Sequence, residues 1–254
     1  MTGRLPRRFA QLFLGLFLYG IGIALIVRGE IGAAPWDVLT QGIGIHTGLS
    51  FGLITVLTSA MVLLIWIPLR QKPGIGTVLN ALLVGPSADV GLALIPAGLD
   101  LWVRILLFIA GLLVLAVATG LYIGAHFGPG PRDGLMTGLN ARTGWAIWKV
   151  RTGIELTVVT LGWILGGNVG IGTAAFALLV GPLCQWAIPF FAVKPRATDA
   201  AATPSDPAAS EPEQLDAEQF DAERLEAAQL EAELETELEG TATPSSPQLD
   251  SPAN

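Results

Sequence analysis

The stretch GIGTVLNALLVGP at residues 74–86 returns as GIGTAAFALLVGP at residues 170–182, with 10 of 13 positions identical. The same offset of 96 residues places GAAPWDVLTQG at residues 32–42 over GPGPRDGLMTG at residues 128–138 without a gap. Biased composition alone does not produce two such blocks in one register. The chain therefore contains an internal repeat.

The composition indicates a polytopic membrane protein in contact with the lipid bilayer. The 254 residues are 52% hydrophobic and 14% charged, and their mean hydropathy is +0.59. A helix of about 21 apolar residues is about 31 Å long, which matches the hydrocarbon core of a bilayer. The sequence predicts an all-α fold with about six transmembrane helices, at residues 9–27, 49–69, 74–99, 105–125, 154–169 and 169–193.

Two Gly- and Pro-rich segments, residues 28–48 and 126–151, each follow the first span of a repeat. Both are moderately apolar but too short and too interrupted to span as single helices. We interpret them as broken elements that are re-entrant or interfacial. The alternative, that they cross the membrane, is left to experiment.

The positions of Lys and Arg predict the orientation. Eleven basic residues fall on one side of the predicted spans, and only Arg28 and Arg104 fall on the other. Basic loops favour the cytoplasm, so both termini are expected there. The repeats, at about residues 9–99 and 105–193, have three spans each. Because three is odd, the second copy is expected to be inverted in the membrane.

Inverted repeats create a pseudo-two-fold axis in the membrane plane, which many secondary transporters use to alternate access to a central site. Gly85-Pro86 and Gly181-Pro182 fall near the middle of the third and sixth spans. Proline removes a helical hydrogen bond, so these pairs are candidate helix breaks at a binding site. The alternative is that they are packing kinks, because Gly and Pro are ordinary in membrane helices.

Each Gly- and Pro-rich segment contains a proline followed by an aspartate. Pro35 with Asp37, and Pro131 with Asp133, fit helices that begin with proline and carry a carboxylate in the first turn. Helix capping by itself explains this spacing. The functional alternative is that both are tips of half-helices that face a cavity, where the aspartates bind a cation or a proton.

Ionisable residues that differ between the repeats are further candidates for substrate or ion contact. Arg151 and Glu155 lie four residues apart and can pair, and Asp89 and Glu155 are the main candidates for proton or cation coupling. For Arg151 the alternative is a charge that reaches the cytoplasmic surface. At the offset of 96 residues, Arg132 aligns with Trp36, Arg151 with Thr55, Glu155 with Ser59, and Gln185 with Asp89.

Several other function classes are disfavoured. One cysteine and two histidines give no basis for a metal site. The sequence has no phosphate-binding loop, zinc-protease motif or nucleophile elbow, so we expect no enzyme activity, no catalytic residue and no cofactor. Basic residues occur singly at the ends of apolar runs, which argues against nucleic-acid binding.

Residues 197–254 differ in character from the membrane domain, residues 1–196. The membrane domain has 13 basic and 6 acidic residues, whereas the tail has 1 basic and 15 acidic residues. A pentad repeat in the tail spreads its apolar residues around a helix, which excludes a coiled coil. We predict a cytoplasmic tail that is disordered or weakly helical, with a partner that its charge does not identify.

Four motifs resemble the bacterial YczE family of integral membrane proteins, which is related to the YitT group. They are GPGPRDGLM at residues 128–136, RTGW at 142–145, RTGIE at 151–155 and the paired GIGT blocks. The likeness covers roughly residues 8–193 and excludes the acidic tail. It implies a multi-pass protein of the bacterial plasma membrane, from a family whose activity is largely unassigned.

The leading hypothesis is a secondary transporter or permease-like protein for a small solute. The competing hypothesis is a membrane scaffold or regulator that acts through lateral contacts and its acidic tail. A homo-oligomer is compatible with either function.

We predict that cysteines at His46 and Asn140 face opposite sides of the membrane. In a Cys184→Ala background, an impermeant thiol reagent should label His46→Cys in intact cells and Asn140→Cys only after lysis. Labelling of both from one side would mean that the repeats are parallel.

Overall fold

The computed structural model of the chain describes residues 5–191, and within them the fold is entirely α-helical. The predicted all-α class is confirmed. The predicted acidic tail, residues 197–254, lies outside the described residues. In the described part, the helices are α1 (Leu5–Gly29), α2 (Pro35–Thr47), α3 (Phe51–Leu69), α4 (Ile75–Leu94), α5 (Leu101–Gly124), α6 (Pro131–Thr143), α7 (Ile147–Ile164) and α8 (Ile171–Phe191).

Five helices of the described part are long and apolar enough to cross a membrane, namely α1, α3, α4, α5 and α8. The sixth predicted span, residues 154–169, is not confirmed. The helix in that region, α7, has 18 residues and includes Lys149, Arg151 and Glu155. Gly144 ends α6 in the left-handed conformation, and the next helix begins three residues later, at Ile147. The charged residues therefore lie within α7 and not in a loop before it.

The repeat in the sequence is also a repeat in local structure. Each of α1 to α4 has a counterpart that begins 96 residues later, so α1 corresponds to α5, α2 to α6, α3 to α7 and α4 to α8. The glycines that end α2 and α6 are equivalent as well. Gly48 and Gly144 have φ angles of 69° and 70°.

The two Gly- and Pro-rich segments each contain a short helix, α2 or α6. Both helices have 13 residues, so each is about 20 Å long and shorter than a bilayer core. Pro35 and Pro131 occupy the first helical positions, where a missing N–H costs nothing. The predicted proline-initiated helices with Asp37 and Asp133 in their first turns are therefore present.

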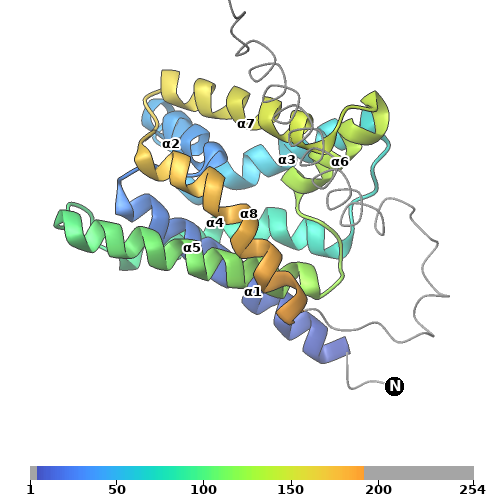
Figure 1. Ribbon diagram of the computed structural model, residues 1–254, viewed down its shortest axis with the longest axis horizontal. Helices are drawn as coiled ribbons and strands as arrows, with labels where there is room; N and C mark the ends of the chain where they lie inside the picture. Colours follow the sequence, from blue (N-terminus) through green and yellow to red (C-terminus); the bar gives the residue numbers. More distant parts are fainter. Residues whose placement is uncertain (1–4, 192–254) are drawn as a thin grey trace, which may run out of the picture. The chain divides into compact units, whose positions relative to one another are not determined.

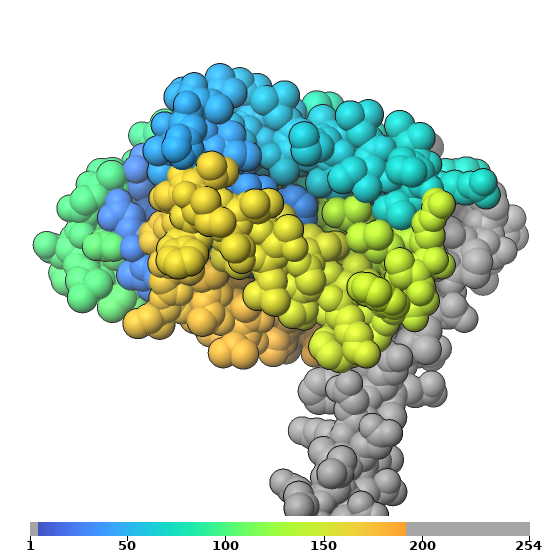
Figure 2. Space-filling view, turned by 90° about the horizontal axis from the view of Figure 1, so that it is seen from above, coloured from blue at the N-terminus to red at the C-terminus, as the bar shows by residue number. Residues whose placement is uncertain are grey.

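The helices form two groups (Figure 1). The first group, which we call the row, consists of α4, α1, α5 and α8, packed side by side in that order with α1 and α5 at the centre. The second group, which we call the ring, consists of α2, α3, α6 and α7, and in it α2 and α6 each pack against both α3 and α7. Figure 2 shows α7, in yellow, beside α2, in blue. The contact of α3 with α4 joins the ring to the row.

The two central helices of the row run antiparallel, and an arginine of each contacts the end of the other. Arg8 and Arg104 occupy equivalent positions in the two repeats. The last carbonyls of a helix lack partners within it, and these guanidinium groups supply them. Arg8 donates to the carbonyls of Ala125 (2.9 Å) and His126 (3.0 Å), and Arg104 donates to those of Gly29 (3.0 Å) and Glu30 (2.6 Å).

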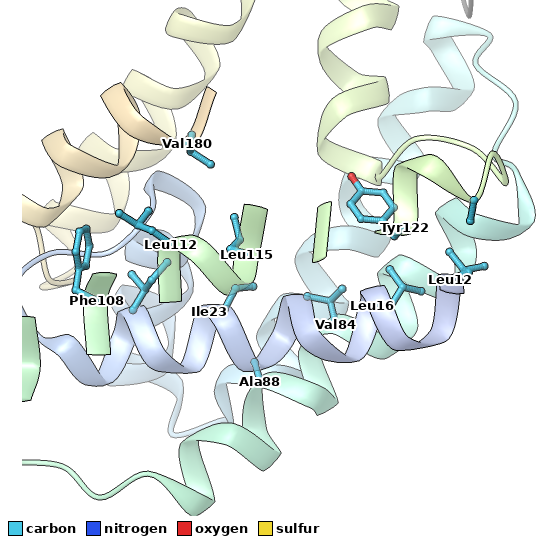
Figure 3. Packing of buried hydrophobic residues seen from close by; sticks show 12 residues of the cluster. Leu12, Leu16, Ile23, Val84, Ala88, Phe108, Leu112, Leu115, Tyr122 and Val180 are labelled. Carbon is cyan, nitrogen blue, oxygen red and sulfur yellow. The ribbon is translucent and has the colours of Figure 1, made fainter. Parts of the chain in front are cut away.

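Each group of helices has its own apolar core. The core of the row contains side chains from all four of its helices, among them Leu16, Val84, Leu115 and Val180 (Figure 3). The core of the ring is built around two tryptophans, Trp36 and Trp66, with one buried residue from α6 and one from α7. Polar side chains that lie between the row and the ring therefore have an apolar core on either side.

Of the two interpretations of the Gly-Pro pairs, helix breaks and packing kinks, helix breaks are not found. Helix α4 continues through Gly85-Pro86, and α8 continues through Gly181-Pro182. Gly85 serves packing, because an added methyl group would collide with the carbonyl oxygen of Gly52 on α3. At Gly181, in contrast, an added methyl group would have no atom within 4 Å.

We predict that Gly85→Ala lowers the free energy of unfolding by about 1–3 kcal/mol, because the new methyl group overpacks the contact of α3 with α4. The matched change Gly181→Ala should leave stability unchanged or raise it by up to about 1 kcal/mol, because alanine favours helix. Unfolding of the purified protein in detergent, followed by circular dichroism, measures both. Equal losses would contradict the packing role of Gly85.

Candidate functional site

A cavity of about 240 Å³ lies between the row and the ring. Its walls come from α1, α5 and α8 on one side and from α2, α6 and α7 on the other. Five of the predicted contact residues line it, and they carry both signs of charge. These residues are Asp37, Arg132, Asp133, Arg151 and Glu155.

The short helices α2 and α6 direct their first turns into this cavity. Pro35, Trp36 and Asp37 line it from α2, and Arg132 and Asp133 line it from α6. A helix N-terminus has free N–H groups and a partial positive charge, so it stabilises a carboxylate in its first turn. The folding of the two segments thus fixes both aspartates beside the cavity.

The most buried charged group at the cavity is Asp37. Its side chain is 1% exposed, and its Oδ1 has no hydrogen-bond partner among the described residues. The nearest cation is Arg132, with 3.8 Å between Nη1 and Oδ1. The same guanidinium lies 5.1 Å from the centre of the Trp36 ring. Trp36 and Arg132 are repeat counterparts, so equivalent positions of the two copies meet here.

Two tyrosines complete this wall of the cavity. The hydroxyl of Tyr122 donates to Oδ2 of Asp133 over 2.9 Å. Tyr19 packs edge to face against Tyr122, with 5.8 Å between ring centres. The sequence analysis did not single out either tyrosine. A phenol within an apolar run is a weak signal, because Tyr is common in membrane helices near their ends.

On α7, Arg151 and Glu155 pair as expected from their spacing. Arg151 donates from Nε to Oε1 of Glu155 over 3.0 Å. Their side chains are 49% and 24% exposed, so this pair is more open than that of Asp37 with Arg132. Arg151 also lines the cavity, which places it among the polar walls of the site.

A second, smaller cavity of about 40 Å³ adjoins the first. The two share Tyr19, Tyr122, Arg132 and Asp133. The other walls correspond through the repeat, because the small cavity has Thr55, Ser59 and Val84 where the large one has Arg151, Glu155 and Val180. We call the first the charged chamber and the second the neutral chamber, because the walls that they do not share include charged side chains in the first and only neutral ones in the second.

The structure places Asp89 outside both chambers. Its carboxylate accepts hydrogen bonds from the Ser50 hydroxyl and from the Gly52 N–H, each over 2.7 Å. It therefore fastens the N-terminus of α3 to α4. Of the predicted helix breaks, Gly181 lines the charged chamber, whereas Gly85, Pro86 and Pro182 line neither chamber. Pro35 lines the charged chamber and Pro131 the neutral one.

Comparison with known proteins gives a family and three relatives. Residues 6–189 match the Family of unknown function (DUF6198). The chain is 38% identical to an "Uncharacterized protein" of Haemophilus influenzae, over 69% of this chain and 80% of the relative. It is 32% identical to the "Uncharacterized membrane protein YczE" of Bacillus subtilis, over 74% of this chain and 89% of the relative.

A third relative is the "Uncharacterized protein YyaS" of Bacillus subtilis, which is 27% identical over 69% of this chain and 90% of the relative. No solved structure gives a significant match. All three relatives match nearly the same share of the chain, and their names state no activity.

We predict that Arg132→Gln lowers the free energy of unfolding by about 3 kcal/mol, because it leaves the buried Asp37 without its cation. The double variant Arg132→Gln with Asp37→Asn should recover part of this loss. The control Arg151→Gln should cost less than about 1 kcal/mol, since its pair is half exposed. Thermal unfolding in detergent measures all three. A double variant with additive losses would contradict the coupling of the two residues.

Proposed function

We propose that this chain, a member of the Family of unknown function (DUF6198), is a secondary transporter for a small polar solute that binds in the charged chamber. The family match and the YczE relative confirm the resemblance drawn from the motifs, and the YczE relative is named as a membrane protein. The observation that carries the proposal is the cavity lined by charged residues of both repeats inside an apolar helical protein.

Helix capping does not account for this set of charges. It explains Asp37 and Asp133, which lie in the first turns of α2 and α6. It does not explain Arg132, Arg151 and Glu155 around the same cavity. Ionisable groups within a membrane protein are costly to bury, and they commonly mark solute or ion pathways. A solute pathway is therefore the economical explanation of all five residues.

The packing of the repeats supports an inverted arrangement. Helices α1 and α5 are repeat counterparts, each is long enough to cross a membrane, and they run antiparallel. If both span, the two copies have opposite directions in the bilayer, as the distribution of basic residues also predicts. In this arrangement α7 is the sixth span, and two of its three charged residues, Arg151 and Glu155, line the charged chamber.

The chemistry of the chamber favours a zwitterionic solute of amino-acid size. Two guanidinium groups and three carboxylates line about 240 Å³. Charge-assisted hydrogen bonds to a carboxylate and to an ammonium group are available from the same wall. A zwitterion can engage both kinds of group at once, whereas a solute with one charge can engage only one kind.

The predicted orientation assigns a side to this chamber. Its walls on α7 and α8 lie toward the ends of these helices that are expected in the cytoplasm. We therefore assign the structure to an inward-facing state of a plasma-membrane protein with both termini in the cytoplasm.

We predict that zwitterionic amino acids stabilise the purified protein against heat, whereas simple sugars and short dicarboxylates do not. A ligand at 100 times its Kd adds about 2.7 kcal/mol to stability. Asp133→Asn should weaken the best hit at least tenfold, and Asp100→Asn, an exposed carboxylate outside the chambers, should not. The hit should also enter proteoliposomes. Unaltered binding to Asp133→Asn would exclude the chamber as its site.

Removal of residues 197–254 separates transport from the scaffold function. A transporter should retain solute uptake without these residues. A scaffold that relies on the tail should lose its partner while the membrane domain still folds. Uptake that depends on the tail would contradict the assignment of transport to the membrane domain alone.

A further inference from the structure

We propose that the neutral chamber is a second binding position for the same solute, reached from the opposite side of the membrane, and that Asp89 holds it closed. This inference rests on the proposed transport function. It adds a site lined by Thr55, Ser59 and Asn80 and assigns Asp89 as the residue that positions its gate.

The two chambers are repeat counterparts, but one is wide and the other narrow. Their walls correspond at offsets of 96 residues, yet the volumes are about 240 Å³ and about 40 Å³. They meet at four shared residues, which include Arg132 and Asp133. A solute held by these two residues can therefore face either chamber without leaving its charged partners.

Helices α3 and α4, beside the neutral chamber, are fastened together. Gly52 on α3 and Gly85 on α4 approach so closely that a methyl group on either would collide with the carbonyl oxygen of the other. Next to this contact, the carboxylate of Asp89 accepts hydrogen bonds from the Ser50 hydroxyl and from the Gly52 N–H, each over 2.7 Å. Ser50 is also the N-cap of α3, because its oxygen accepts from the Leu53 N–H. We call this set the α3–α4 latch.

The counterpart helices, α7 and α8, lack such a latch. Ala146, Trp148 and Gln185 stand where the latch has Ser50, Gly52 and Asp89. The N-cap of α7, Ala146, makes no side-chain hydrogen bond, and Trp148 is 51% exposed. Helix α7 also makes no packing contact with α8 comparable to that of α3 with α4. No latch therefore holds α7 to α8 beside the charged chamber, whereas the α3–α4 latch closes the neutral chamber.

The different walls give the two chambers different affinities. In the charged chamber, Arg151 and Glu155 add to the shared pair. In the neutral chamber, the buried hydroxyls of Thr55 and Ser59 replace them. Neutral hydrogen bonds are about half as strong as charge-assisted ones, so a zwitterion binds the neutral chamber more weakly. In the predicted orientation, the α3–α4 latch lies on the outer side.

The test measures access to Ser59, which is 6% exposed in the neutral chamber. Ser59→Cys in a Cys184→Ala background is treated in intact cells with a charged, impermeant methanethiosulfonate reagent. We expect slow modification with Asp89 intact and at least tenfold faster modification when Asp89→Asn is added. Ser50→Ala, which removes one of the two donors to Asp89, should give a smaller increase. The control Gln185→Ala, at the counterpart position, should give none.

A second experiment closes the latch covalently. Ser50→Cys with Asp89→Cys, again in the Cys184→Ala background, is oxidised in proteoliposomes. The oxidised protein should still show stabilisation by the zwitterion that binds the wild type, but its uptake should fall at least tenfold and return on reduction. Gel filtration and circular dichroism verify that each variant folds.

The outcomes separate the gate from the transport function. Fast labelling of Ser59→Cys with the latch intact, or equal labelling with and without Asp89→Asn, overturns the gate even if a solute binds. Undiminished uptake by the oxidised pair overturns it as well. Absence of any solute binding to the wild type instead overturns the proposed function, and the labelling rates then still report whether the neutral chamber opens.

Discussion

The antiparallel contact of α1 with α5 is the centre of the row and positions its outer helices. Each helix brings an arginine to the exposed carbonyl end of the other, and apolar side chains fill the space between them. The last carbonyls of a helix lack partners within it, so the reciprocal bonds favour both the direction and the register of the pair. The outer helices of the row, α4 and α8, then pack at equivalent places on the two sides.

The functional features lie where the two copies depart from this symmetry. Trp36 and Arg132 are equivalent in sequence and meet at the cavity, where one supplies an aromatic face and the other a cation. Arg151 and Glu155 add two charges to one chamber, whereas the other has Thr55 and Ser59 at the equivalent positions. A duplicated scaffold thus holds two unlike half-sites. The proposed solute would bind one more firmly than the other because their side chains differ, although their backbones correspond.

Much of the fold could be predicted from the sequence, because long apolar runs indicate membrane helices and the repeat shows which helices correspond. The all-α class and the proline-initiated helices with Asp37 and Asp133 are found in the structure. The start of α7 was missed, because Lys149 and Arg151 suggested a loop whereas Arg151 lines a cavity. The role of Asp89 was also not predictable, since its partners Ser50 and Gly52 lie 39 and 37 residues away. Proline at Pro86 and Pro182 suggested helix breaks, but a membrane helix tolerates proline when its neighbours support it.

The arginines that join α1 and α5 also bear on how such a duplicated protein keeps its topology. Arg28 and Arg104 are the two basic residues on the predicted outer side, against eleven on the inner side. Both are engaged with backbone carbonyls, Arg28 with that of Leu92 and Arg104 with those of Gly29 and Glu30. The two exceptions to the predicted charge asymmetry thus each complete the end of a neighbouring helix, as Arg8 does on the predicted inner side. Replacing Arg28 or Arg104 to strengthen the orientation signal would therefore leave backbone carbonyls without their donor.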